Sequence, residues 1–394
     1  MLNRRSFLRS ASAGALSVYM GQELMAMEHA RQTTGIAIED TIWLASNLNP
    51  LGASPKAMQA LSDSSNQAYR YGGHKALALQ EKLHQHHNLP FQSYEDPKQY
   101  FAKYDAFTRN PVLIGNGCTQ LLNAAAMAFG DNGGNYIESF PTYNQLGRTV
   151  TEHHPGMKRA QIPVNDEYQN NIPAILAATN KNTRFIYLVN PTNPTGTVTA
   201  KADLMRLINE TPENVIIIID EAYMELADPG ATVSLIPESL KRPNLLVFKT
   251  FSKVYGLAGL RVGYAIGPVP LLQQLNRRTD GMGFQNLVSM AAASAALDDK
   301  AFIQASIHHG NKTKAVMQQR FSDYGFTPIP SHTSFMWVKT GRNNTAAVET
   351  LRRRGVFIKD GQSYWQRPGY LRVSVGSDDD MARFYRHFEE VMGV

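Results

Sequence analysis

The chain has 394 residues, of which 43% are hydrophobic and 18% charged, a balance typical of a globular protein with a large core. Its net charge of +6 is modest, and its lysines and arginines are dispersed rather than gathered with aromatic residues in a stripe, which argues against nucleic-acid binding. The single cysteine, Cys118, excludes an intrachain disulfide, and no apolar run approaches the roughly 20 residues that a membrane-spanning helix requires.

The amino terminus is patterned differently from the rest of the chain. Arg4 and Arg5 precede Ser6-Phe7-Leu8 and a short stretch of small and apolar residues, the order of a twin-arginine export signal. The alternative is a disordered basic tail. We predict that residues 1–28 are a leader that engages the twin-arginine export machinery and sends the protein to the periplasm; if the leader is not used, the protein stays in the cytoplasm.

Six short apolar runs rich in β-branched residues follow, each ending in turn residues. They are PVLIGNG from residue 111, NYIESFPTY from 135, RFIYLVNPTNPTG from 184, NVIIIIDEAY from 214, NLLVFKTFSK from 244 and RVGYAIG from 261. Their continuous hydrophobicity is typical of strands buried on both faces, and helix-like segments such as residues 118–130 alternate with them. The alternation predicts an α/β fold with a mostly parallel sheet between helices, which binds ligands at the carboxyl ends of its strands.

The pattern changes from about Asp280 onward. Long helical stretches are followed by the strand-like segments SFMWVKT, GVFIKDG and YLRVSVG. We predict a large domain over residues 62–279 and a smaller α+β domain made of residues 29–61 and 280–394.

Polar residues with binding chemistry follow the first predicted strands. Gly115 and Gly117 allow a tight turn in which the backbone amides near Cys118 and Thr119 face an anion at a helix amino terminus, although such turns serve many unrelated sheets. Tyr143 also follows a strand, either as a core tyrosine or as a ring that stacks on a flat ligand.

The next two strand ends present Asn193, Asp220 and Tyr223. The prolines of NPTNPTG make a rigid turn that exposes Asn193, and NVIIIIDEAY ends in the other two residues. A buried carboxylate can pair with the protonated nitrogen of a pyridine ring in a ligand. The amide and the phenol can donate hydrogen bonds to a phenolic oxygen on the same ring. Aspartates with a structural role are also common at strand ends.

Lys253 follows the next strand, with Thr250, Ser252 and Arg261 close to it in sequence. Two hydroxyls and a guanidinium are suited to hold a phosphate. An amine beside a phosphate site suits a Schiff base with pyridoxal phosphate, while the alternative is a solvated lysine.

In this order, the five motifs resemble those of fold-type I pyridoxal-phosphate transferases, specifically the class I/II aminotransferases nearest to histidinol-phosphate aminotransferase. The resemblance rests on TFSKVYGLAGLRVGY, NPTNPTG and DEAYMEL, together with LASNLNPLGASPKAMQAL near the amino terminus and YLRVSVG near the carboxyl terminus. It extends from about Ile42 to the end of the chain, and it implies that residues 62–279 bind the cofactor.

The resemblance implies a role for each matching residue. The implied catalytic residues are Lys253, which forms the Schiff base and moves the proton, Asp220 at the pyridine nitrogen and Tyr223 at the phenolic oxygen. The other implied cofactor contacts are Asn193 at the phenolic oxygen, Tyr143 against the ring, and Cys118, Thr119, Thr250, Ser252 and Arg261 around the phosphate. Arg372 in YLRVSVG grips the substrate's carboxylate, or its phosphate in a histidinol-phosphate reaction, and Asn193 is the second residue implied in substrate binding. Tyr71 reaches the cofactor phosphate of a neighbouring subunit, which implies a homodimer.

The chain departs from the family pattern in several places. Tyr71 is followed by Gly72-Gly73 rather than by proline and an acidic residue, and Cys118-Thr119-Gln120 replaces a commoner small and acidic triplet. Lys359 stands where the family typically has arginine, and QSYWQRPG is an aromatic and basic insert in the same loop. The changes in this loop lie on the substrate side.

We therefore predict an aminotransferase that uses pyridoxal phosphate to move an amino group between a small-molecule donor, an L-amino acid or a histidinol-phosphate-like amine, and a 2-oxo acid. A decarboxylase or lyase of the same fold is one alternative, and a non-catalytic ligand-binding protein is another. No metal site is predicted, because His84 and His87 lack acidic neighbours and are expected on a solvated helix surface.

Overall fold

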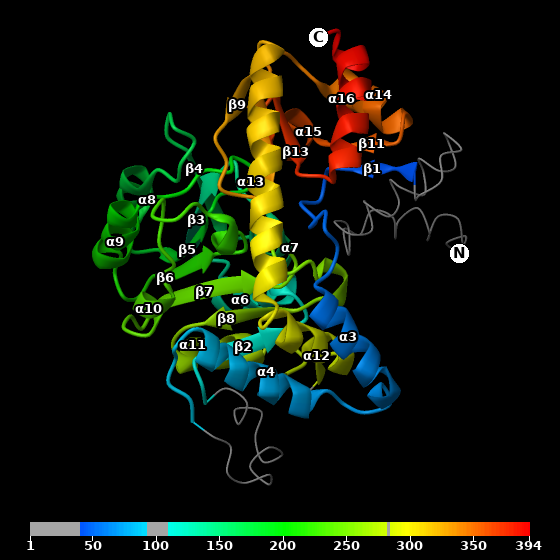
Figure 1. Cartoon of the computed structure of the whole chain (residues 1–394). Coiled ribbons are helices and arrows are strands. Elements are labelled where there is room, and N and C mark those ends of the chain that lie inside the picture. The colour runs from blue at the N-terminus through cyan, green and yellow to red at the C-terminus, as the bar shows by residue number, and fades with distance from the viewer. Residues whose placement is uncertain (1–39, 93–108, 282–283) are drawn as a thin grey trace, which may run out of the picture.

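The computed structural model describes residues 40–92, 109–281 and 284–394, so the predicted leader lies outside the described residues. A seven-stranded sheet forms the centre of the larger part of the molecule (Figure 1). Its spatial order is β2 (Val112–Gly115), β8 (Gly263–Ile266), β7 (Leu245–Thr250), β6 (Ile216–Asp220), β5 (Thr183–Val189), β3 (Asn135–Phe140) and β4 (Lys158–Pro163). The strands from β7 to β4 are parallel, and β8 is antiparallel to both of its neighbours. The predicted α/β fold with a mostly parallel sheet is confirmed.

All six predicted apolar runs contain a strand of this sheet, but β4 was not predicted. β4 is an edge strand whose residues are exposed or half-buried, and it begins with Lys158 and Arg159. An edge strand buries little apolar surface, so its sequence carries no apolar run.

Helices connect the strands and cover the sheet. They are α6 (Cys118–Phe129), α7 (Gln145–His153), α8 (Ile172–Ala178), α9 (Lys201–Glu210), α10 (Ile236–Ser239) and α11 (Val269–Asn276), with the short turns η4 (Met224–Leu226) and η5 (Ala258–Leu260). α6 ends before Gly130, whose backbone is extended with φ −66°.

Three further helices pack together beside β2: α3 (Pro55–Ser64), α4 (Gly73–His86) and α12 (Leu287–Ala296), with η2 (Ser65–Gln67) after α3 (Figure 1). Met290 and Ala293 of α12 belong to the same hydrophobic cluster as the large sheet. The prediction had assigned α12 to the small domain, whereas an almost entirely apolar helix of small residues is best buried against the larger core. His84 of α4 is also buried, with its ring 5.1 Å from that of Phe91, so the prediction that it lies on a solvated surface was wrong.

The smaller part of the molecule is built on a four-stranded antiparallel sheet with its own hydrophobic cluster. The strand order is β12 (Lys359–Asp360), β13 (Tyr370–Ser374), β10 (Phe335–Lys339) and β9 (Thr327–Ile329), accompanied by α14 (Thr345–Arg353), α15 (Gly361–Trp365) and α16 (Asp378–Met392). β1 (Ile42–Trp43) pairs in parallel with β11 (Val356–Phe357). The long helix α13 (Lys300–Asp323) runs from the large sheet to this part (Figure 1). No described helix has the length and apolar character needed to cross a membrane.

Candidate active site

A cavity of about 1210 Å³ lies at the carboxyl ends of the parallel strands. Eleven of the twelve predicted site residues line it: Cys118, Thr119, Tyr143, Asn193, Asp220, Tyr223, Thr250, Ser252, Lys253, Arg261 and Arg372. They come from positions up to 254 residues apart (372 − 118) and from both parts of the molecule. The fold therefore brings together the side chains that the motifs singled out.

The amino terminus of α6 forms a cradle at one end of the cavity. Gly117 has φ 79°, and because it has no side chain, the first N–H groups of α6 have no side-chain cap. A Cβ on Gly117 would lie 2.5 Å from Arg261 Nη2, and one on Gly263 would lie 2.3 Å from the backbone nitrogen of Cys118. The two glycines thus allow the guanidinium and the helix amides to converge, an arrangement that binds anions.

Two hydroxyls and the Arg261 side chain complete this cradle. Thr250 Oγ1 donates to Ser252 Oγ at 2.9 Å and accepts from the backbone N–H of Ser252 at 3.1 Å. Arg261 donates through Nη1 to the carbonyl of Ala258 and through Nη2 to Thr119 Oγ1 at 3.3 Å. Its backbone is left-handed, with φ 53°, and this turn points the side chain at α6.

Lys253 lies in the wall of the cavity close to the amino-terminal segment. Its Nζ donates to the carbonyl oxygens of Ser46 and Asn47, both at 3.3 Å, and lies 5.5 Å from the centre of the Tyr223 ring. The amine is therefore anchored by backbone dipoles beside the other predicted catalytic side chains.

Asp220 is a buried carboxyl group at the end of β6. It accepts hydrogen bonds from the backbone N–H of Ala222 at 3.0 Å and from the hydroxyl of Tyr187 at 3.4 Å. Burial raises the pKa of Asp220 to about 6, while these two hydrogen bonds and nearby Lys253 act in the opposite direction. A cationic ring nitrogen placed against this carboxylate would compensate its burial, so the residue fits a protonated pyridine.

Asn47 is a site residue that the sequence reasoning did not nominate. Its Nδ2 donates to the hydroxyl oxygen of Tyr223 at 2.8 Å, and its Oδ1 accepts from Ser374 Oγ at 2.7 Å. Burial raises the pKa of Tyr223 to about 12, although Arg372 and the bond from Asn47 lower it. Tyr223 is thus kept as a neutral hydroxyl that can donate a hydrogen bond into the cavity.

Arg372 projects into the cavity from β13. Nη1 donates to Asn193 Oδ1 at 2.8 Å, and Nη2 donates to the carbonyl of Ala45. The residue is almost fully buried, yet its Nε has no hydrogen-bond partner among the described residues. One donor of the guanidinium is therefore left for a ligand, as expected for a carboxylate clamp.

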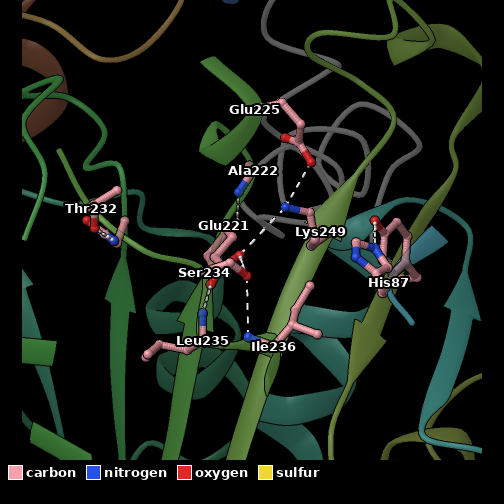
Figure 2. A network of polar contacts seen from close by, with 12 residues as sticks. His87, Glu221, Ala222, Glu225, Thr232, Ser234, Leu235, Ile236 and Lys249 are labelled. Carbon is pink, nitrogen blue, oxygen red and sulfur yellow. Dashed lines mark hydrogen bonds and ion pairs between the residues drawn. The ribbon is translucent and has the colours of Figure 1, made fainter. Parts of the chain in front are cut away.

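A buried ion network of Lys249, Glu221 and Glu225 holds the segment that follows β6, as Figure 2 shows. Lys249 Nζ lies 2.8 Å from Glu225 Oε1 and 3.6 Å from Glu221 Oε2. Glu221 also accepts from Ser234 Oγ and from the backbone N–H of Leu235, both at 2.7 Å. These contacts fix both ends of the segment from residue 222 to residue 235.

Tyr71 is the one predicted site residue that does not line the cavity. It is 81% exposed, and its ring packs edge-on against Phe284 at 5.8 Å. Lys359, at the position that departs from the family pattern, is buried outside the cavity with its Nζ 4.2 Å from the centre of the Tyr364 ring.

Chemically, the cavity holds an amine, a buried carboxylate, neutral hydrogen-bond donors, an anion cradle and a guanidinium with an open donor. The amine and the carboxylate suit an aldehyde cofactor with a pyridine ring, and the cradle suits its phosphate. The residues present therefore fit pyridoxal phosphate.

Comparison with known proteins agrees with this geometry. The family model "Aminotransferase class I and II" matches residues 39–388. The chain is 32% identical to histidinol-phosphate aminotransferase 2 of Carboxydothermus hydrogenoformans over 372 residues, which are 93% of this chain and 95% of that protein. It is 32% identical to histidinol-phosphate aminotransferase 2 of Pseudomonas fluorescens over 352 residues, 89% of this chain and 88% of that protein.

Two solved structures share the fold. One is histidinol-phosphate aminotransferase from Sinorhizobium meliloti in complex with pyridoxal-5'-phosphate, with a TM-score of 0.80 and 24% identity over 92% of this chain and 93% of that one. The other is aspartate aminotransferase from Thermus thermophilus with maleate, with a TM-score of 0.78 and 19% identity over 97% and 98% of the two chains. Because the family model spans nearly all of the described chain, this protein belongs to the class I and II aminotransferases, enzymes of fold type I that depend on pyridoxal phosphate.

Proposed function

We propose that this aminotransferase moves an amino group between an L-amino acid, or a histidinol-phosphate-like amine, and a 2-oxo acid. The observation that carries the proposal is the meeting of Lys253, Asp220 and Arg372 in one cavity: an amine, a buried carboxylate and a clamp with an open donor. The names of the curated relatives support a phosphorylated amine as one candidate donor.

The cofactor contacts follow from the positions of the side chains. We assign the phosphate to the α6 cradle with Thr250, Ser252 and Arg261, the pyridine nitrogen to Asp220, and the ring face to Tyr143. Asn193 and Tyr223 are assigned to the phenolic oxygen, because both line the cavity and their side chains interact with each other. When bound, pyridoxal phosphate draws electron density from the carbon that bears the substrate's amino group.

Lys253 has two roles in the proposal. Its Nζ would hold the cofactor covalently, and as a free amine the same atom would act as the general base that takes the proton from the substrate carbon and as the general acid that gives it back on the product side. The carbonyl oxygens of Ser46 and Asn47 hold that amine within the cavity. Arg372 orients the substrate through its anionic group.

The test uses purified protein loaded with pyridoxal phosphate. Wild type should show visible absorbance from the lysine-bound cofactor, and Lys253→Ala should not. Each standard amino acid except glutamate, and histidinol phosphate, is then supplied with 2-oxoglutarate as acceptor, and the glutamate formed is measured. The proposal would be rejected if the protein stayed colourless and took up no cofactor, or if no donor gave glutamate. Release of carbon dioxide or ammonia would favour a lyase.

We further propose that the active enzyme is a homodimer in which Tyr71 completes the neighbouring site. The support is that Tyr71 and Phe284 are both exposed. Their aromatic rings pack against each other on the surface, outside the cavity of their own subunit. Hybrids of Lys253→Ala and Tyr71→Phe subunits should contain one intact site and recover activity. If Tyr71 acted within its own subunit, the hybrid would stay as inactive as the parents.

For residues 1–28 we propose export through the twin-arginine route to the periplasm, supported by the Arg4-Arg5 pair and the segment after it. Arg4→Lys combined with Arg5→Lys should retain the protein in the cytoplasm, as measured by cell fractionation. If the variant and wild type were found in the same cell fractions, the segment would be a basic tail and not an export signal.

A further inference from the structure

We propose that Trp365 is a positioning residue for the substrate clamp, setting the orientation of Arg372 and tying it to the loop that carries Tyr143. The inference rests on the proposed function, since it assigns Arg372 to the substrate's anionic group. Trp365 lies in the insert QSYWQRPG and is nearly buried, but it does not line the cavity.

The first step of the argument is that Trp365 is held rigidly relative to Arg372. Asp360 caps α15 by accepting from the backbone N–H groups of Gln362 and Ser363, both at 3.2 Å. Asp360 is itself in β12, which pairs with β13, so that Lys359 lies opposite Arg372. The amino-terminal end of α15 is therefore fixed to the strand that carries the clamp, and Trp365 is the last residue of this five-residue helix.

The second step is the contact between the rings and the guanidinium. Cζ of Arg372 lies 5.3 Å from the centre of the Trp365 ring and 5.1 Å from that of Phe335. Both separations are in the range of cation–π attraction, which is stronger for a desolvated guanidinium. With Nη1 bonded to Asn193, these rings determine which way the unpartnered Nε faces.

The third step is a hydrogen bond that crosses between the two parts of the molecule. The indole N–H of Trp365 donates to the carbonyl of Thr142 at 3.0 Å, in the loop after β3 and directly before Tyr143. A second contact runs in parallel, with Cζ of Arg367 5.0 Å from the centre of the Phe140 ring. Trp365 thus holds the clamp and the ring-stacking residue in one geometry.

The test compares three variants by two measurements. One is the Kd of 2-oxoglutarate, measured by isothermal titration calorimetry with the enzyme loaded with pyridoxal phosphate. This form of the enzyme carries no amino group to transfer, so 2-oxoglutarate binds without reacting. The other is the KM and kcat for 2-oxoglutarate with the best donor from the panel above. Trp365→Phe keeps a ring but loses the indole donor, and Trp365→Ala loses both. Trp337→Phe is the packing control, since Trp337 is also buried in the same aromatic cluster.

We expect Kd and KM to rise about fivefold in Trp365→Phe, the effect of one hydrogen bond, and about thirtyfold in Trp365→Ala. kcat should stay within about threefold, because the clamp contacts the anion equally before and during proton transfer. Trp337→Phe should leave Kd and KM within about twofold of wild type.

Two results would overturn the inference. If both Trp365 variants bind 2-oxoglutarate as wild type does, the residue only fills the core. If Trp337→Phe weakens binding as much as Trp365→Phe, the effect is general packing. Should Trp365→Ala not fold, Trp365→Phe decides alone. A wild-type enzyme inactive with every donor would instead reject the proposed function, which the panel detects separately.

Discussion

The amide of Asn47 donates a 2.8 Å hydrogen bond to the hydroxyl oxygen of Tyr223, although 176 residues separate them in the chain. Asn47 also bonds to Ser374 in the small sheet, while Tyr223 belongs to the loop after β6 of the large sheet. A single buried amide therefore links the two halves of the molecule at the catalytic wall.

We predict that Asn47 and Tyr223 are energetically coupled. Asn47→Ala leaves a buried hydroxyl without its donor, so the free energies of unfolding of Asn47→Ala, Tyr223→Phe and the double variant should reveal a coupling of about 1 kcal/mol. Urea denaturation of the cofactor-free protein measures it. Asn47→Ala combined with Tyr187→Phe is the matched control, because Tyr187 bonds to Asp220 instead, and this pair should be additive.

The raised pKa of Asp220 predicts a specific pH dependence of stability. Between about pH 4 and 6 the folded protein keeps a proton that the unfolded chain has released, so stability falls as the pH rises through this window. At about 1.4 kcal/mol per pKa unit, the loss is on the order of 3 kcal/mol.

The measurement is the unfolding free energy of the cofactor-free protein at pH 4.5 and pH 7, in wild type and Asp220→Asn. The variant should lack this loss and be the more stable protein at pH 7, yet lose transamination by about two orders of magnitude. If the unfolding free energies of wild type and Asp220→Asn changed equally with pH, Asp220 would not be the group responsible.

Gly117→Ala should damage the phosphate cradle. The new methyl group would meet Arg261 Nη2 at 2.5 Å and displace the guanidinium, so the affinity for pyridoxal phosphate should fall by about tenfold or more, measured by absorbance titration. Gly52→Ala is the matched control, because Gly52 has the same φ of 79° but no atom within 4 Å of the added carbon. Gly52→Ala also places a side chain at a positive φ, and it should keep the affinity.

Lys249→Met should be strongly destabilising. It leaves the carboxylates of Glu221 and Glu225 without their buried cation, and breaking such a pair costs about 3 to 5 kcal/mol. Burial raises the pKa of Glu221, so a fall in pH protonates its carboxylate. The difference in the free energy of unfolding between Lys249→Met and wild type should then become smaller.

Lys241→Met is the control for this prediction, since Lys241 pairs with Glu238 on the surface and should contribute about 1 kcal/mol or less. Similar losses in the two variants would show that the buried network contributes no more than a surface pair.

The strand ends were predictable from sequence because they obey local rules. Continuous apolar runs mark β5, β6 and β7, and the polar residues just after them line the cavity, as Asn193 and Asp220 do. The glycine turn before α6 was also predictable from sequence, because Gly115 and Gly117 directly precede the helix. The structure explains Gly117, since a side chain there would collide with Arg261.

The residues that escaped prediction act over long distances. Asn47 and Trp365 bond to partners 176 and 223 residues away, and nothing in the residues around them encodes those partners. The place of α12 escaped for a related reason: its composition indicates burial, but not against which of the two cores.

The segment that begins with β1 has a consequence for the maturation of the protein. Ile42 and Trp43 pair with the small domain, Ala45 holds Arg372 through its carbonyl, and the next two residues hold Lys253. A protease that removed the proposed leader and continued past residue 41 would begin to dismantle the active site. If the proposed leader is removed, the cut therefore has to fall before Ile42.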